Sequence, residues 1–149
     1  MNIVTVSYHS TNYYAIDIKG GKLLIDCGWP DTLPQFTAKL KRKGIVPNEI
    51  KYILVTHFHP DHAGLVQEFK DLGAKLILME TQVGYKARLK SLIKTKDVSY
   101  KEIRENDNYE LKFKDSRLFL ASLVLQRDFI LQRDFGYYNE TLRFTLFGD

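Results

Sequence analysis

The fold of this chain is decided by residues 53–64, which read Ile53-Leu54-Val55-Thr56-His57-Phe58-His59-Pro60-Asp61-His62-Ala63-Gly64. An apolar run, which predicts a buried strand, leads into three histidines and one aspartate within six residues. The 149-residue chain has four histidines, and the one outside this stretch is His9. Because imidazole nitrogen and carboxylate oxygen are common metal ligands, the stretch predicts a metal site at the end of a strand.

The spacing of these side chains allows them to share an ion. His57 and His59 lie two residues apart on an extended segment, so their side chains point the same way. Pro60 then turns the chain, and Asp61 and His62 begin a helix whose side chains return to the same pocket. A mixed nitrogen and oxygen ligand set without thiolate suits Zn²⁺, with Mn²⁺ and Fe as alternatives.

The ligand set is wide enough for two ions, with His57 and His59 on one and Asp61 and His62 on the other. A water bridging them would become hydroxide near neutral pH and attack an acyl or phosphoryl centre. Asp61 would then be the catalytic residue that orients this water. Taken singly, each side chain could be a surface residue near a helix start, with Asp61 as the N-cap. The four together favour the metal site.

Three residues outside the motif have competing interpretations. Asp26 follows the apolar run Leu23–Ile25. Its carboxylate could hydrogen-bond to a ligand histidine or to the loop backbone without binding the metal itself. Alternatively, Asp26 forms a turn. Cys27 is expected to be a small buried packing residue rather than a ligand or nucleophile. His9 stands alone in a strand or turn, and we expect it to have no metal role.

Hydrophobic periodicity predicts a mixed α/β (α+β) sheet with flanking helices. Strands are predicted at 4–8, 12–18, 22–26, 52–56, 75–79, 118–125 and 140–147, helices at 33–40, 65–72 and 81–93, and a second hairpin at 101–104 and 109–113. Gly20-Gly21 predicts a tight hairpin turn between two of the early strands. Residues 125–136 contain a near-exact six-residue tandem repeat that matches no repeat architecture. Residues 126–149 are therefore treated as a divergent part of a single domain, 1–149.

Composition limits the possible functions. The hydrophobic content of 44% and charged content of 27% are typical of a soluble globular protein. No stretch approaches the ~20 apolar residues that span a bilayer, and the amino terminus resembles a strand rather than a signal peptide. The single cysteine excludes an internal disulfide and suits a reducing cytoplasm. The net charge of +4 comes from residues 83–117, where acids interrupt the basic residues. This favours a solvated surface, so nucleic acid is not the expected partner.

Three segments closely resemble the metallo-β-lactamase superfamily, and its glyoxalase II-like hydrolases in particular: Asn12-x-Tyr14, Leu24-Ile25-Asp26-Cys27-Gly28 and residues 53–64. The resemblance extends from about residue 4 to residue 125. It implies an αββα sandwich, a site for one or two zinc ions at the sheet edge, and hydrolysis of a small-molecule substrate by metal-bound hydroxide. The superfamily includes thioesterases, nucleases and phosphodiesterases, so the substrate does not follow.

The chain departs from the family pattern in its last third. Family members carry a further metal-binding histidine in a Pro-Gly-His turn, whereas this chain has no histidine after His62. Phe147-Gly148-Asp149 resembles the family element whose aspartate bridges the metals, which would make Asp149 a ligand. We therefore expect a truncated member with an incomplete sandwich, in which the first metal position has only His57 and His59.

Two functions follow from these expectations. The first is a zinc-dependent hydrolase whose activity is impaired by missing ligands. The second is a non-catalytic, truncated module that binds a partner or self-associates through an exposed sheet edge.

Overall fold

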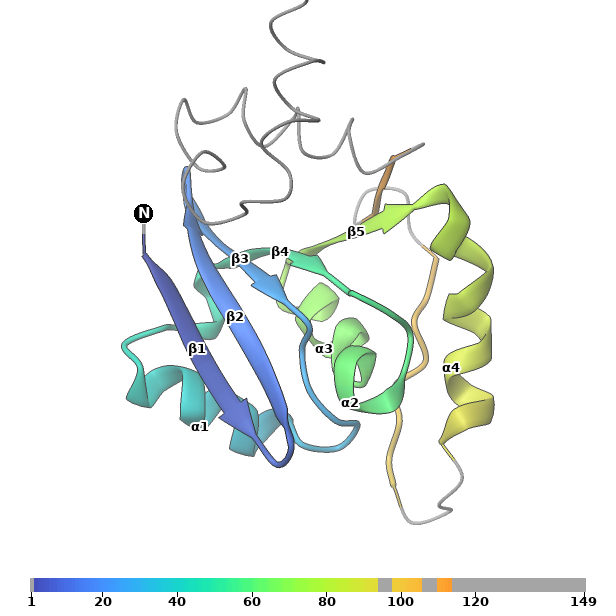
Figure 1. Ribbon diagram of the computed structural model, residues 1–149, viewed down its shortest axis with the longest axis horizontal. Coiled ribbons are helices and arrows are strands. Elements are labelled where there is room, and N and C mark those ends of the chain that lie inside the picture. Colours follow the sequence, from blue (N-terminus) through green and yellow to red (C-terminus); the bar gives the residue numbers. More distant parts are fainter. Residues whose placement is uncertain (1, 94–97, 106–109, 114–149) are drawn as a thin grey trace, which may run out of the picture.

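The computed structural model describes residues 2–93, 98–105 and 110–113 and contains a six-stranded sheet in the order β1-β2-β3-β4-β5-β6 (Figure 1). The strands are β1 (Ile3–Tyr8), β2 (Thr11–Ile18), β3 (Gly21–Ile25), β4 (Ile50–Leu54), β5 (Lys75–Met79) and β6 (Glu110–Phe113). The first three form an antiparallel meander, and β4, β5 and β6 then add in parallel. The predicted mixed sheet is confirmed.

The turn between β2 and β3 shows why the early strands pair as predicted. Gly20 has a φ of 83°, which suits a residue without Cβ, and Ile18 pairs with Gly21 directly after the turn. A Cβ on Gly21 would lie 2.5 Å from the carbonyl oxygen of Glu49. The two glycines therefore serve different purposes, one for the turn and one for the close approach of a neighbouring segment.

The helices lie between the strands in sequence. They are α1 (Leu33–Arg42), α2 (Pro60–Ala63), α3 (Val66–Asp71) and α4 (Lys86–Leu92), with 3₁₀ turns η1 (Pro47–Glu49) and η2 (Glu80–Tyr85). The helix predicted at 81–93 is thus a 3₁₀ turn that contains Gly84, followed by α4. In the described ranges, none of the helices is long and apolar enough to cross a membrane.

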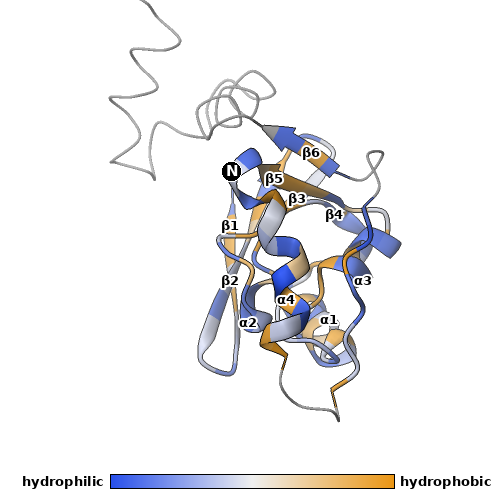
Figure 2. Ribbon diagram, turned by 90° about the vertical axis from the view of Figure 1, so that its right-hand side faces the viewer, coloured by the Kyte–Doolittle hydropathy of each residue, from blue (hydrophilic) through white to orange (hydrophobic). Residues whose placement is uncertain are grey.

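The main core lies between the sheet and the helices. Tyr13 of β2 contacts Phe36 of α1 edge to face at 5.0 Å between ring centroids, and Phe36 contacts Phe69 of α3 at 6.0 Å. A second, smaller apolar cluster includes Ile16, Leu23 and Ile77. The alternation of β2 explains this division, because successive side chains of a strand point to opposite faces. The apolar course of β5 is orange in Figure 2.

The hairpin predicted at 101–104 and 109–113 is wrong. Residues 101–104 form no strand, and β6 pairs with β5 in parallel. The segment instead runs along α3, where the amide of Arg104 donates to Gln67 Oε1 (2.8 Å) and Lys70 Nζ donates to the carbonyl of Arg104 (2.5 Å). Side chains of α3 thus satisfy the backbone groups that a strand partner would have satisfied, while Ile103 is buried in the core.

Several expectations lie outside the described residues. They are the turn at 106–108, the strands at 118–125 and 140–147, the tandem repeat and Asp149.

A buried charge cluster holds β6 against the helices. The carboxylate of Glu110 is 0% exposed and lies 2.9 Å from Lys70 Nζ of α3 and 3.0 Å from Lys86 Nζ of α4. The two lysine side chains are 3% and 5% exposed. Glu105 is 3.4 Å from Lys86 but is 73% exposed, so its charge is largely screened by water. Glu110 is therefore the counter-ion on which both buried ammonium groups depend.

Replacing Glu110 with alanine should lower the free energy of unfolding by about 3–5 kcal/mol, because it leaves buried charges without a partner. The matched control is Glu102→Ala, which breaks the exposed pair with Lys90 and should change stability by at most about 1 kcal/mol. Urea denaturation measures both. Equal effects of the two substitutions would contradict the role given to the buried cluster.

Candidate metal centre

Parallel pairing of β3 and β4 brings their carboxyl ends to the same edge of the sheet. Asp26 directly follows β3, and its amide donates to the carbonyl of Leu54, the last residue of β4 (2.9 Å). Thr56 and the histidine motif follow β4 from the same edge. Ligand sites of α/β sheets commonly lie outside the carboxyl ends of parallel strands, and this edge carries the polar residues.

The carboxylate of Asp26 joins three segments of this edge. Asp26 has a φ of 57°, a left-handed conformation that aspartate tolerates better than most residues, and it is 4% exposed. Its Oδ1 accepts a hydrogen bond from the amide of Thr56 (2.8 Å), and the Thr56 hydroxyl lies 2.9 Å from Oδ2. Oδ2 is also 2.7 Å from Nδ1 of His62. Asp26 therefore takes a left-handed conformation directly after β3 and supports a histidine of the motif.

This contact decides which nitrogen of His62 faces the site. With Nδ1 donating to Asp26, Nε2 carries a lone pair and lies 3.1 Å from Asp61 Oδ2. A lone pair and a carboxylate oxygen at this distance repel each other unless a proton or a cation lies between them. Zinc ligands lie roughly 2.0–2.2 Å from the ion, so the spacing suits two adjacent ligands of one ion.

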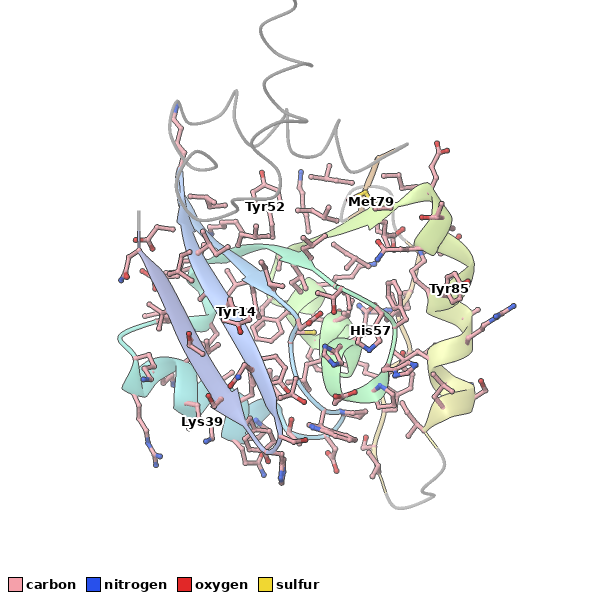
Figure 3. The ribbon with its side chains drawn as sticks, viewed as in Figure 1. Tyr14, Lys39, Tyr52, His57, Met79 and Tyr85 are labelled. Carbon is pink, nitrogen blue, oxygen red and sulfur yellow. The ribbon has the colours of Figure 1, made fainter. Side chains whose placement is uncertain are left out.

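The three imidazoles of the motif converge. The ring centroids of His57 and His62 are 4.0 Å apart, and those of His57 and His59 are 4.6 Å apart. Partial desolvation, followed by the charges of the two neighbouring imidazoles, lowers the pKa of His57. His57 and His59 are exposed, so the cluster is open to solvent. Figure 3 shows His57 on the segment that joins β4 to α2.

The side chains of the motif are of the types that bind metal ions, and one pair of donor atoms also has the spacing of adjacent ligands. Asp61 and His62 supply an oxygen and a nitrogen 3.1 Å apart, with two more imidazoles beside them. Across the residues that the structure describes, no group of three or more His, Cys, Asp or Glu side chains is arranged to hold an ion as it stands. Asp149, the remaining predicted ligand, lies outside those residues.

The other two residues considered from the sequence lie as follows. His9 occupies the turn between β1 and β2 with a φ of 51°, and its ring packs edge-on against Tyr8 at 4.4 Å. Cys27 is fully buried, and its amide donates to the carbonyl of His62 (2.8 Å). Burial raises the pKa of the Cys27 thiol, which keeps the sulfur neutral.

Three residues that the sequence did not single out contact the motif or the residues that lead into it. Thr11 Oγ1 donates to Asp61 Oδ2 (3.0 Å), and Tyr13 Oη donates to the Asp61 carbonyl (2.9 Å). Gln82 of η2 donates through Nε2 to the carbonyl of Val55 (3.1 Å). The available signal was a pair of hydroxyl groups at alternate positions of a strand whose buried face is otherwise apolar.

The family-like residues of the same strand lie on its other face. Tyr14 is 39% exposed and is labelled on β2 in Figure 3. Asn12 accepts a hydrogen bond from the hydroxyl of Ser7 on β1 (2.7 Å).

Tight packing against the loop after β3 fixes the position of α2. The amide of Gly64 donates to the carbonyl of Gly28 (2.8 Å). A Cβ on Gly64 would lie 2.3 Å from the backbone nitrogen of Pro30 and 2.5 Å from the carbonyl oxygen of Pro60. Gly64 has a helical φ of −63°, so glycine is required here for space and not for backbone conformation.

Comparison with known proteins agrees with this geometry. Residues 7–122 match the model of the Metallo-beta-lactamase superfamily, and the chain belongs to this superfamily, whose members are typically metal-dependent hydrolases. The flavo-diiron protein FprA2 of Clostridium acetobutylicum is 25% identical over 111 residues, which cover 74% of this chain and 27% of that protein.

Solved structures show the same fold. The metallo-beta-lactamase GOB-18 from Elizabethkingia meningoseptica is similar with a TM-score of 0.60 and 25% identity, over 76% of this chain and 42% of that chain. BJP-1, a subclass B3 metallo-beta-lactamase of Bradyrhizobium japonicum, has a TM-score of 0.55 and 26% identity, over 70% and 41%. The chain thus spans between about a quarter and two fifths of the length of these relatives.

Gly64→Ala should lower the free energy of unfolding by about 1–3 kcal/mol, because the added methyl group forces α2 away from Pro30. Gly84→Ala is the matched control, since a Cβ there meets nothing within 4 Å. It should leave stability unchanged or raise it by up to about 1 kcal/mol. Thermal unfolding measures both, and a neutral Gly64→Ala would show that the loop yields to the methyl group.

Proposed function

We propose that this chain carries the metal centre of a zinc-dependent hydrolase. The observation that supports this is the convergence of the His57, His59 and His62 rings beside the pair formed by His62 Nε2 and Asp61 Oδ2. The motif lies at the carboxyl ends of parallel strands, and family membership provides independent support.

Each residue of the motif has a proposed role. His57 and His59 would hold one ion, and Asp61 and His62 the other. Bound metal would supply Lewis acidity and lower the pKa of a coordinated water, which then serves as the nucleophile. Oδ1 of Asp61 takes no part in the contacts with Thr11 and His62, so this oxygen would accept a proton from the attacking water and orient it.

The two metal positions would differ in affinity. The described residues supply only two imidazoles for the first position. The second has Asp61, a histidine already oriented by Asp26 and, as a sequence-based prediction, Asp149. Zinc is the first choice of metal, with iron and manganese as alternatives; the relative FprA2 is named as a flavo-diiron protein.

The proposed substrate is a small molecule with an acyl or phosphoryl centre. The exposed faces of His57 and His59 would give it access to the metal. A reducing cytoplasm is the proposed compartment, because the single cysteine is buried and forms no disulfide.

The decisive experiment compares zinc binding and hydrolysis in three proteins. The unaltered chain with added Zn²⁺ should bind one ion more tightly than the other and hydrolyse a thioester or a phosphodiester. His59→Ala should reduce turnover by at least about tenfold, because it removes one of two imidazoles from the first position. His9→Asn, which tolerates the positive φ at this position, should behave like the unaltered chain.

The proposed function fails if the unaltered chain takes up no zinc in mass spectrometry and calorimetry. It also fails if it binds zinc but hydrolyses neither substrate class.

A second candidate function is a module that self-associates. Within the described part of the chain, β1 lies at an edge of the sheet and has no charged side chain, whereas edge strands usually carry charges that prevent pairing. Ile3 at its start is 37% exposed. We propose antiparallel pairing of β1 between two copies.

Sizing chromatography with light scattering should then show a dimer that becomes a monomer in Thr5→Lys, because a charge is placed in the middle of β1. The matched control is Lys41→Glu, a charge change at an exposed position of α1 away from β1 in sequence, which should leave the dimer intact. A monomer in the unaltered chain would exclude this function.

A further inference from the structure

We infer that Thr11 is a positioning residue for Asp61 and fixes the orientation of the carboxylate that would bind the proposed metal. The inference rests on the proposed metal centre and adds a residue from outside the histidine motif. Thr11 and Asp61 are 50 residues apart in sequence and are joined by a hydrogen bond of 3.0 Å.

Helix α2 cannot hold Asp61 in place by itself. It has four residues, about one turn, and an isolated turn is unstable because fixing its backbone gains too few hydrogen bonds. The last carbonyls of a helix also lack partners within the helix. Here the Asp61 carbonyl accepts from the Tyr13 hydroxyl (2.9 Å), and the His62 carbonyl accepts from the Cys27 amide (2.8 Å). The position of α2 is therefore set by β2 and by the loop after β3.

Thr11 and Tyr13 hold Asp61 at two points. They lie two residues apart on β2 and so project from the same face; Thr11 is 8% exposed and Tyr13 is 0% exposed. The Tyr13 ring is held in turn by its edge-to-face contact with Phe36. One hydroxyl reaches the main chain of Asp61 and the other reaches its side chain, which fixes both the location and the rotation of the carboxylate.

The rotation matters because the terminal torsion of aspartate is soft. Asp61 is 25% exposed in its side chain, so packing alone does not hold it. A carboxylate oxygen has two lone-pair directions. The Thr11 hydroxyl occupies one of them on Oδ2, which leaves the other for the space shared with His62 Nε2, 3.1 Å away. Without Thr11, Oδ2 is free to turn away from this space.

The test compares Thr11→Val, which keeps the shape and removes the hydroxyl, with Thr11→Ser, which keeps the hydroxyl. Zinc affinity is measured in competition with a chromophoric chelator, and the ligand field is measured from the visible spectrum of the Co²⁺-loaded proteins. Thr11→Val should bind Zn²⁺ about tenfold or more weakly, as expected for loss of a residue that orients a ligand, and should change the Co²⁺ spectrum. Thr11→Ser should match the unaltered chain in both.

Two measurements separate a positioning role from a structural one. Thermal unfolding in EDTA should lower the midpoint of the valine variant no more than that of Tyr13→Phe, since each variant loses one hydrogen bond to Asp61. Tyr13→Phe, which leaves the carboxylate contact in place, should lower this midpoint and change the Co²⁺ spectrum less than Thr11→Val does. If the valine variant does not fold, Thr11→Ala replaces it in the same comparison.

Each outcome bears on the inference. Equal zinc affinity and equal spectra in the valine and serine variants overturn it and leave the proposed function standing. Zinc binding that depends on Thr11, in a chain that hydrolyses nothing, supports the inference while the proposed function fails. A chain that binds no zinc overturns both.

Discussion

The arrangement of the candidate site depends on the carboxylate of Asp26. It accepts hydrogen bonds from the backbone and hydroxyl of Thr56, and it contacts Nδ1 of His62. A buried carboxylate is stable only when such donors surround it. These hydrogen bonds therefore fix the end of β3, the end of β4 and helix α2 relative to one another. The parallel pairing of β3 with β4 is the condition for this contact, since it brings both carboxyl ends to one edge.

Much of the fold could be predicted from the sequence because local pattern and burial agree. The runs that became β3, β4 and β5 are short and apolar, and the prediction placed all three, with β5 confirmed at Lys75–Met79. The prediction failed at residues 101–104, where the turn signal at residues 106–108 suggested the first strand of a hairpin. Gln67 and Lys70 satisfy the backbone there, and contacts across more than 30 residues of sequence leave no periodic signal.

The same limit applies to the site. The motif at residues 57–62 could be identified because its donors are adjacent in sequence and imidazole is rare in this chain. For Asp26 the sequence left a turn and a supporting contact open, and the structure shows the contact with His62, made by a residue in the left-handed conformation. Thr11 and Tyr13 could not be identified in advance, because a hydroxyl on a strand has many possible partners and theirs is about 50 residues away.

The buried cluster of Lys70, Glu110 and Lys86 bears on how the last described strand finds its alignment. Glu110 pairs with Leu76 across β5 and β6, and its side chain reaches the lysines from the helix side of the sheet. A slip of one residue would carry this carboxylate to the opposite face of the sheet. The two lysine ammonium groups would then be left in the interior without a counter-ion. Misaligned forms of β6 are thus penalised electrostatically, so the cluster favours one register of β6 against β5.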